Sequence, residues 1–244
     1  MRNKINNEIG AIIFSRFDST RLYGKALIDI EGRPLLGRVI DRALLIKGIN
    51  KLIVATSKRE IDDPIHEFAL SQGIKTFRGS CEDVYGRSLN TCEDFKLDGF
   101  IRICGDRPFL DYELISKALN IFKKNNYDLV TTMFPRTYPP GLTIEIIKKN
   151  LLKKFENKVR SKEDRENLTS FFYKNSSGIN IKNIDNPNFK NIRNLRFVVD
   201  IQNDLDRARW IAKNNSDKII PKQDEIISLA FEYEELQKTK NKQI

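Results

Sequence analysis

The fold is decided by one stretch, IGAIIF at residues 9–14, and by the polar loop SRFDSTRLYGK that follows it at residues 15–25. Six residues without a charge predict a strand that is buried on both faces, as in a parallel sheet. In α/β folds, ligands bind beyond the carboxyl ends of such strands. We therefore expect an α/β chain whose ligand site begins in this loop.

Further apolar runs alternate with amphipathic stretches along the first half of the chain. The predicted strands are 9–14, 51–56, 75–77, 100–104 and 128–132. The predicted helices are 34–47, 62–71, 82–95 and 111–125, the last capped by Asp111. Because right-handed crossovers are the rule between parallel strands, this alternation predicts a Rossmann-like, mostly parallel sheet flanked by helices.

The alternation loosens after about residue 135. Here the predicted strands are 142–146 and 195–200, and the predicted helices are 148–158, 162–174, 203–213 and 223–237. No internal repeat or long linker divides the chain. The expected organisation is a single domain over residues 1–244, with residues 135–194 as a less regular insertion.

Composition narrows the function classes. The formal net charge of +10 favours anionic partners, either nucleic acid or small anions. The basic residues are spread along the chain and no aromatic-interleaved motif accompanies them, so we expect no nucleic-acid partner. No apolar run approaches the roughly 20 residues of a membrane span, and residues 1–14 do not form a signal peptide. These features predict a cytoplasmic protein without a membrane partner.

Histidine and cysteine chemistry is poorly represented. His66 is the only histidine, and the three cysteines, Cys81, Cys92 and Cys104, form no C-x-x-C pair. Catalytic triads and structural zinc sites need more of these residues than the chain has. Catalysis should therefore depend on carboxylates, lysines, arginines and a bound metal.

The loop at residues 15–25 is the first candidate site. It carries the cations Arg16, Arg21 and Lys25 and the hydroxyls of Ser19 and Thr20. A triphosphate is bound by such cations together with hydroxyl and backbone donors. The alternative is an ordinary basic surface loop, because the stretch matches neither a Walker A motif nor a dinucleotide-binding fingerprint.

Two aspartates provide the second candidate site. Asp106 ends the predicted strand 100–104 after a glycine, and Asp200 ends the predicted strand 195–200. Carboxylates at neighbouring strand ends can share one Mg²⁺ over bound phosphates. The alternatives are that Asp106 is a turn residue and that Asp200 caps the following helix.

Several short motifs, in a fixed order, extend this pattern along residues 8–210. The motifs are R-x-x-STRL-x-GK at 16–25, EGRPL at 31–35, VATS at 54–57, DDPI at 62–65, FRGS-x-EDV at 77–84, RI-x-GD-x-P at 102–108, GL-x-IE at 141–145, RE-x-LT at 165–169 and R-x-x-VD-x-x-x-DL at 196–205. In these motifs the chain resembles the cytidylyltransferase superfamily, which includes the 3-deoxy-manno-octulosonate and acylneuraminate cytidylyltransferases. It is most similar to the spore-coat polysaccharide biosynthesis protein F group.

The resemblance implies a GT-A-type Rossmann fold, CTP as co-substrate, Mg²⁺ and a homodimer. It implies that residues 135–194 serve acceptor binding or dimerisation. The implied roles are catalysis by Arg16, Lys25 and Asp106; nucleotide binding by Arg16, Ser19, Thr20, Arg21, Lys25, Arg78, Ser80 and Asp106; acceptor binding by Glu145, Arg165 and Thr169; and metal binding by Asp106 and Asp200.

Four residues depart from the pattern of that family. Asp18 places a negative charge in the phosphate loop, and Tyr23 replaces a proline. Arg107 follows the metal-binding aspartate, and Thr143 stands where the nearest group often has aspartate. Asp18 bears on catalysis, whereas Arg107 and Thr143 bear on the choice of acceptor.

The function that these features predict is transfer of CMP from CTP to a sugar acid or sugar phosphate, with release of pyrophosphate. Cell-surface polysaccharide or glycan synthesis is the expected context. Three alternatives remain: a nucleotidyltransferase with another nucleotide or a non-sugar phosphate acceptor, a GT-A glycosyltransferase, and a non-catalytic nucleotide- or polyanion-binding protein.

Overall fold

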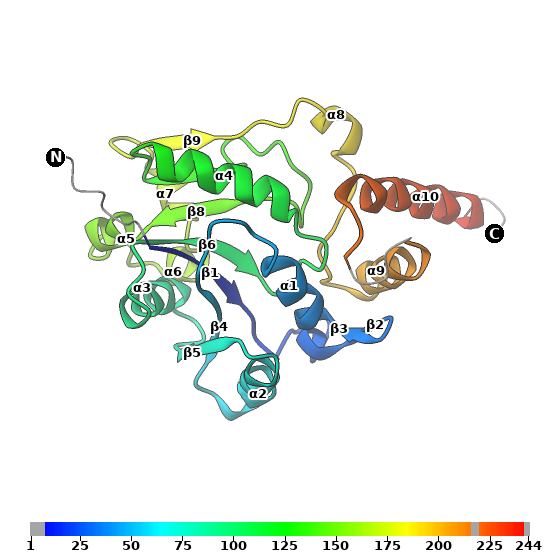
Figure 1. Cartoon of the computed structure of the whole chain (residues 1–244), viewed down its shortest axis with the longest axis horizontal. Helices are drawn as coiled ribbons and strands as arrows, with labels where there is room; N and C mark the ends of the chain where they lie inside the picture. Colours follow the sequence, from blue (N-terminus) through cyan, green and yellow to red (C-terminus); the bar gives the residue numbers. More distant parts are fainter. Residues whose placement is uncertain (1–7, 216–219, 242–244) are drawn as a thin grey trace.

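The computed structural model describes residues 8–215 and 220–241, and a seven-stranded sheet forms its centre (Figure 1). The strand order is β5-β4-β1-β6-β8-β7-β9. The strands are β1 (Ile9–Phe14), β4 (Leu52–Ser57), β5 (Lys75–Gly79), β6 (Gly99–Cys104), β7 (Leu129–Thr131), β8 (Glu145–Lys148) and β9 (Ile181–Asn183).

The predicted mostly parallel sheet is confirmed. β5, β4, β1 and β6 run parallel to one another, and β7 runs parallel to β9. β8 alone is antiparallel to its two neighbours, β6 and β7. The predicted first strand has the bounds expected from its sequence, because β1 lies in the middle of the sheet and is covered on both faces.

Two layers of helices cover the sheet. One face packs against α1 (Leu35–Ala43), α2 (Asp63–Ser71) and α4 (Tyr112–Lys124), and its core includes Ile13. The other face packs against α3 (Val84–Asp94), α5 (Lys149–Phe155) and α7 (Ser170–Lys174), and its core includes Ile12. Successive residues of a strand point to opposite faces, which is why two adjacent isoleucines belong to different cores.

A third core lies beside the sheet, on the side where the chain ends in Figure 1. There α9 (Gln202–Asn214) and α10 (Gln223–Asn241) pack with the small hairpin of β2 (Asp29–Ile30) and β3 (Arg33–Pro34). The remaining elements are α6 (Lys162–Glu166), α8 (Phe189–Ile192) and the 3₁₀ turns η1 (Lys25–Leu27) and η2 (Glu60–Asp62).

The predicted strand at 195–200 is wrong. The segment pairs with no strand among residues 8–215 and 220–241. The amide of Phe197 donates to the carbonyl of Pro140 at 2.7 Å, and the amide of Val199 donates to the carbonyl of Asp106 at 2.9 Å. Leu195, Phe197 and Val199 are buried in the third core. An alternation of apolar and polar residues predicts an extended segment with one buried face. It does not reveal whether that segment hydrogen-bonds to a neighbouring strand.

Other boundaries differ where local signals are weak. The predicted helix 34–47 ends at Ala43, the predicted strand 142–146 begins only at Glu145, and the predicted helix 162–174 is divided into α6 and α7. β9 and α8 were not expected. The predicted cap of α4 is confirmed, because the Asp111 carboxylate accepts the amide of Leu114 at 2.9 Å. Residues 1–7, part of the stretch considered as a signal peptide, lie outside the described residues.

Among the described residues, no helix has the length and apolar character required to cross a membrane.

Candidate functional site

A pocket of about 420 Å³ opens beyond the carboxyl ends of β1 and β6. That position is where ligands bind in open parallel sheets, and the volume lies within the usual range for small-molecule sites. It is lined by Phe14, Ser15, Arg16, Ser19, Thr20, Arg21, Lys25, Ala26, Cys81, Val84, Arg87, Arg102, Cys104, Gly105, Asp106, Glu166, Asn167 and Asp200.

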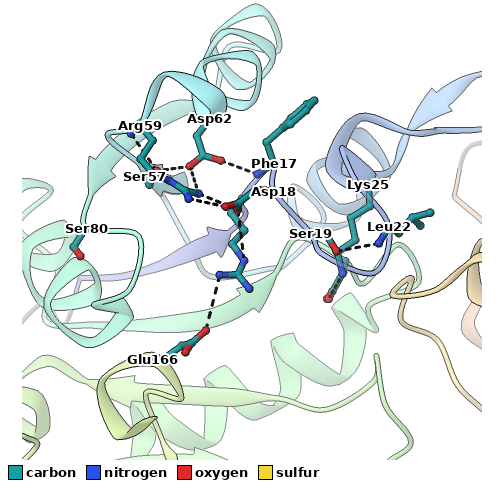
Figure 2. A network of polar contacts seen from close by, with 12 residues as sticks. Phe17, Asp18, Ser19, Leu22, Lys25, Ser57, Arg59, Asp62, Ser80 and Glu166 are labelled. Carbon is teal, nitrogen blue, oxygen red and sulfur yellow. Dashed lines mark hydrogen bonds and ion pairs between the residues drawn. The ribbon is translucent and has the colours of Figure 1, made fainter. Parts of the chain in front are cut away.

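The loop after β1 is held over this pocket by its own backbone and by the Asp62 side chain of η2. The Gly24 amide donates to the carbonyl of Phe17 at 3.0 Å, and the Phe17 amide donates to the Asp62 carboxylate at 2.7 Å (Figure 2). Gly24 has a φ of 65°, which favours glycine, and it directly precedes η1. Lys25 is thereby turned toward the pocket.

Lys25 joins the two predicted metal-binding aspartates. Its ammonium lies 3.2 Å from Asp106 Oδ2, 3.0 Å from Asp200 Oδ1 and 3.0 Å from the carbonyl of Val199. Burial alone would raise the pKa of Asp200, but hydrogen bonds from Arg21 and Lys25 outweigh it and the pKa lies below its ordinary value. Both carboxylates are thus directed at one cationic position.

This donor set fits a magnesium ion. One carboxylate oxygen of Asp106 and one of Asp200 lie at similar distances from the Lys25 ammonium, 3.2 and 3.0 Å. Such a pair suits Mg²⁺, which is usually bound by one or two carboxylates plus substrate phosphates and water. The described residues contain no cluster of three or more potential metal-binding side chains. A metal at Asp106 and Asp200 would therefore need ligands from substrate.

Arg16 and Arg21 are the exposed cations of the pocket. Arg21 donates to Asp200 Oδ2 while 64% of its side chain stays exposed. Arg16 is half exposed, and its ion-pair partners among the described residues are both distant: Asp18 at 4.0 Å and Glu166 at 3.9 Å. Neither arginine is buried in a network, so both can turn toward an incoming phosphate.

Arg78 and Ser80 lie outside the residues that line the pocket. Arg78 pairs with Asp63 and donates to the carbonyls of Ser57 and Arg59, each at 2.9 Å. The Ser80 hydroxyl accepts the amide of Asp83 at 3.2 Å. Arg78 thus fixes the loop after β4, and Ser80 fixes the loop after β5. The second loop contains Cys81, which lines the pocket.

The three predicted acceptor residues are not among the described residues that line the pocket. Glu145 is 4% exposed and accepts from Arg102 Nη1 at 2.6 Å and from the Tyr173 hydroxyl at 2.7 Å. Thr169, also buried, hydrogen-bonds to the same carboxylate. Arg165 binds the Asp83 carboxylate through two nitrogens, at 2.9 and 2.6 Å.

Two arginines of the pocket were missed by the sequence reasoning. Arg102 lines the pocket and is the partner of Glu145. Arg87 of α3 lines it as well, donates to the carbonyl of Ser80 at 2.7 Å and lies 5.6 Å from the ring of Phe14. A signal existed for Arg102, because it is a charge inside an otherwise apolar strand. Arg87 gave none, since arginine is common on amphipathic helices.

The departures Arg107 and Thr143 are in contact. Arg107 Nη1 donates to the carbonyl of Thr143 at 2.7 Å, which ties the residue after Asp106 to the chain preceding β8. Tyr23 is 67% exposed and packs edge-on against Phe17 at 5.5 Å. The aromatic pair is an intraloop contact, which partly replaces the rigidity that a proline would give.

Comparisons with known proteins cover the whole pocket. A family model described as cytidylyltransferase matches residues 10–237. The chain is 27% identical to spore coat polysaccharide biosynthesis protein SpsF of Bacillus subtilis (strain 168), over 91% of this chain and 94% of that protein. It is 32% identical to a 3-deoxy-manno-octulosonate cytidylyltransferase of Trichlorobacter lovleyi, over 48% of this chain and 46% of that protein.

A solved structure agrees with the sequence matches. The chain is similar to a cytidylyltransferase from Leptospira borgpetersenii serovar Hardjo-bovis, with a TM-score of 0.84 and 25% sequence identity. The likeness covers 96% of this chain and 95% of that one. The family match over residues 10–237 includes the loop at 15–25, β6 and the segment that carries Asp200.

Proposed function

The chain belongs to the cytidylyltransferase family and is a nucleotidyltransferase, and from this premise we propose that it transfers CMP from CTP to a sugar acid or sugar phosphate. The observation that carries the proposal is the position of Lys25 between Asp106 and Asp200, in a pocket that also presents Arg16 and Arg21. A nucleoside triphosphate needs this combination of cations and metal-binding carboxylates.

In the proposed reaction, an oxygen of the acceptor attacks the α-phosphorus of CTP. The bond from that phosphorus to the bridging oxygen of the β-phosphate breaks, and pyrophosphate leaves with the electron pair. Arg16, Arg21 and Lys25 bind the triphosphate oxygens and stabilise negative charge that grows on them. Since little covalent chemistry is left to the protein, positioning and charge stabilisation supply most of the catalysis.

Asp106 and Asp200 are the proposed Mg²⁺ ligands. When bound, the ion would neutralise charge on the phosphates and on the leaving pyrophosphate. Lys25 lies at the same carboxylates and would move from bridging them to contacting a phosphate as the site fills. This shift would keep the local charge balanced in both states.

The acceptor class is supported by the relatives. One is named for 3-deoxy-manno-octulosonate, a sugar acid, and another for spore-coat polysaccharide biosynthesis. An acidic acceptor also suits a pocket whose wall includes Arg87 and Arg102. We propose that residues 135–194 serve acceptor binding through Glu145, which holds Arg102 in place, and through Thr169, which hydrogen-bonds to the Glu145 carboxylate.

We propose a cytoplasmic homodimer that uses the same segment. Phe134, directly before that segment, is 39% exposed and stacks on Tyr173 within it, with ring centroids 5.2 Å apart, so an exposed aromatic ring lies at the start of the segment. Sedimentation at several concentrations would measure the mass. A mass near twice 28.4 kDa supports the dimer, and a concentration-independent monomer contradicts it.

Pyrophosphate release tests the reaction. The protein is incubated with CTP, UTP, GTP or ATP, with Mg²⁺, and with a panel of sugar acids and sugar phosphates. Release with CTP and one acceptor would establish the reaction and identify the acceptor. Equal release with every nucleotide would contradict CTP preference, and release from a nucleotide without any acceptor would indicate hydrolysis instead of transfer.

A further inference from the structure

Asp18 introduces a carboxylate into the loop that carries the phosphate-facing cations, and two arginines lie beside it. Arg59 binds it through two nitrogens, with Nη1 to Oδ2 at 2.6 Å and Nη2 to Oδ1 at 2.9 Å. Arg16 Nε stands 4.0 Å from Oδ1. The hydrogen bonds from Arg59 hold the pKa of Asp18 below its ordinary value, so the carboxylate is charged at neutral pH. Asp18 is thus bound tightly by one arginine and loosely by the other.

Arg59 is fixed from outside the loop. Its Nε donates to the Ser57 hydroxyl at 3.1 Å, and Nη2 also donates to Asp62 at 3.0 Å. Asp62 is buried and accepts the Phe17 amide (Figure 2). The end of β4 and the start of α2 therefore place the Arg59 guanidinium against Asp18.

Arg16 has the opposite character. It lines the pocket and is half exposed, and within the part of the chain that the structure describes its ion-pair partners are Asp18, at 4.0 Å, and Glu166, at 3.9 Å. If Arg59 were absent, the Asp18 carboxylate would have Arg16 as its nearest cation within the described residues. A bidentate pair between them would remove Arg16 from the phosphates.

We propose that Arg59 is a positioning residue for triphosphate binding: by occupying Asp18, it keeps Arg16 available to the phosphates of the nucleotide. The inference rests on the proposed function, because it takes Arg16 as a phosphate ligand. Arg59 acts through Asp18, because it is not among the described residues that line the pocket. The pairing of Arg59 with Asp18 explains how the chain tolerates a negative charge in the loop at residues 15–25.

A double-mutant cycle tests this role. Calorimetry would measure the binding of CTP with MgCl₂, and of inorganic tripolyphosphate, to the wild type, Arg59→Gln, Asp18→Asn and the double variant. Arg59→Gln should weaken CTP binding about tenfold, the effect of losing roughly one charge-assisted contact. The double variant should bind within about twofold of Asp18→Asn, because no carboxylate remains to capture Arg16.

A matched control removes a similar ion pair elsewhere. Arg33 binds Asp41 through two nitrogens, at 2.9 and 2.7 Å, and neither residue lines the pocket. Arg33→Gln should leave CTP affinity unchanged. Arg59→Lys keeps a cation beside Asp18 and should bind CTP more tightly than Arg59→Gln, even though the fork geometry is lost.

The outcomes separate this inference from the proposed function. Wild-type affinity in Arg59→Gln would overturn the inference, and so would a double variant as weak as Arg59→Gln, since Arg59 would then only anchor the loop. If the wild type binds both probes but the effects of Arg59→Gln and Asp18→Asn on affinity are simply additive, the inference fails and the proposed function stands. A wild-type protein that binds neither probe overturns both. Thermal midpoints confirm that each variant is folded before its affinity is compared.

Discussion

Asp106 is the residue whose charge the proposed chemistry needs most. Asp106→Asn preserves size and leaves an oxygen that can accept from Lys25, so the fold should be retained. The loss of the carboxylate charge should lower pyrophosphate release by on the order of 10²-fold or more. Steady-state kinetics and a thermal melt measure the two effects. A fully active Asp106→Asn protein would remove Asp106 from the metal site.

Glu145 should matter for stability in a pH-dependent way. Burial alone would raise its pKa, but Arg102, Tyr173 and Thr169 outweigh burial and lower the pKa below its ordinary value. A lowered pKa in the folded state means that the stabilisation is complete above the unfolded-state pKa and is lost as the pH falls through the folded-state pKa. Stability should therefore decline in acid below about pH 4.5.

The Glu145→Gln variant tests this buried ion pair. It leaves the Arg102 guanidinium without its carboxylate partner and should lower the free energy of unfolding by roughly 3–5 kcal/mol. Denaturant titrations at pH 7 and pH 4 should show a smaller acid-dependent loss in the variant than in the wild type. Glu93→Gln, which breaks the exposed pair with Lys153, is the control and should change neither quantity measurably.

At the residue scale, sequence patterns predicted the loop cations, the two loop hydroxyls and the two aspartates among the residues that line the pocket. The loop cations and Asp106 follow apolar strands directly, so their place at a sheet edge is determined by local sequence. Arg87 and Arg102 could not be assigned in this way, because their role depends on which side chains meet across three elements. Asp18 could be recognised as a departure, but its pairing with Arg59 depends on a contact 41 positions away along the chain.

At the element scale, the segment 195–200 depends on one close approach. Gly141 has a φ of 97°, and a Cβ there would lie 2.4 Å from the carbonyl carbon of Phe197. Gly141→Ala should therefore displace the segment that carries Asp200, and lower both activity and the thermal midpoint. Melting curves and pyrophosphate release would measure both losses.

Gly178→Ala is the matched control for that variant. Gly178 also has a positive φ, 74°, but a Cβ there meets nothing within 4 Å. The substitution should cost about 1–2 kcal/mol of backbone strain and leave activity intact. Equal effects of the two variants on activity would show that the contact with Phe197 does not position Asp200.

The same segment shows why some elements could not be predicted. Strands β1, β4 and β6 are long and apolar, and each was predicted to within one or two residues. Segment 195–200 has the alternation of a strand, yet it bonds to the chain at Pro140 and Asp106 instead of to a ladder. Its hydrogen-bond partners are set by tertiary packing, which a local pattern does not contain. β9 has only three residues, two of them polar, and gave no signal.

At the scale of the whole molecule, nucleotide and metal should stabilise the fold together. The proposed triphosphate-binding cations and the two aspartates come from the loops after β1 and β6 and from the segment before α9, so a ligand bound to all of them would tie the sheet to the third core. Binding at a concentration 100 times Kd adds about 2.7 kcal/mol, which should raise the thermal midpoint by roughly 5–10 °C. CTP with Mg²⁺ should produce the full shift, and EDTA should reverse most of it.

The central claim is that Asp106 and Asp200 hold a divalent cation over the phosphates of a nucleotide. Anomalous diffraction from crystals grown with Mn²⁺ and a non-hydrolysable CTP analogue tests it most directly. The account predicts an anomalous peak within about 2.5 Å of a carboxylate oxygen from each aspartate, with the triphosphate against Arg16 and Arg21. A bound nucleotide whose metal lies away from both aspartates would contradict the account.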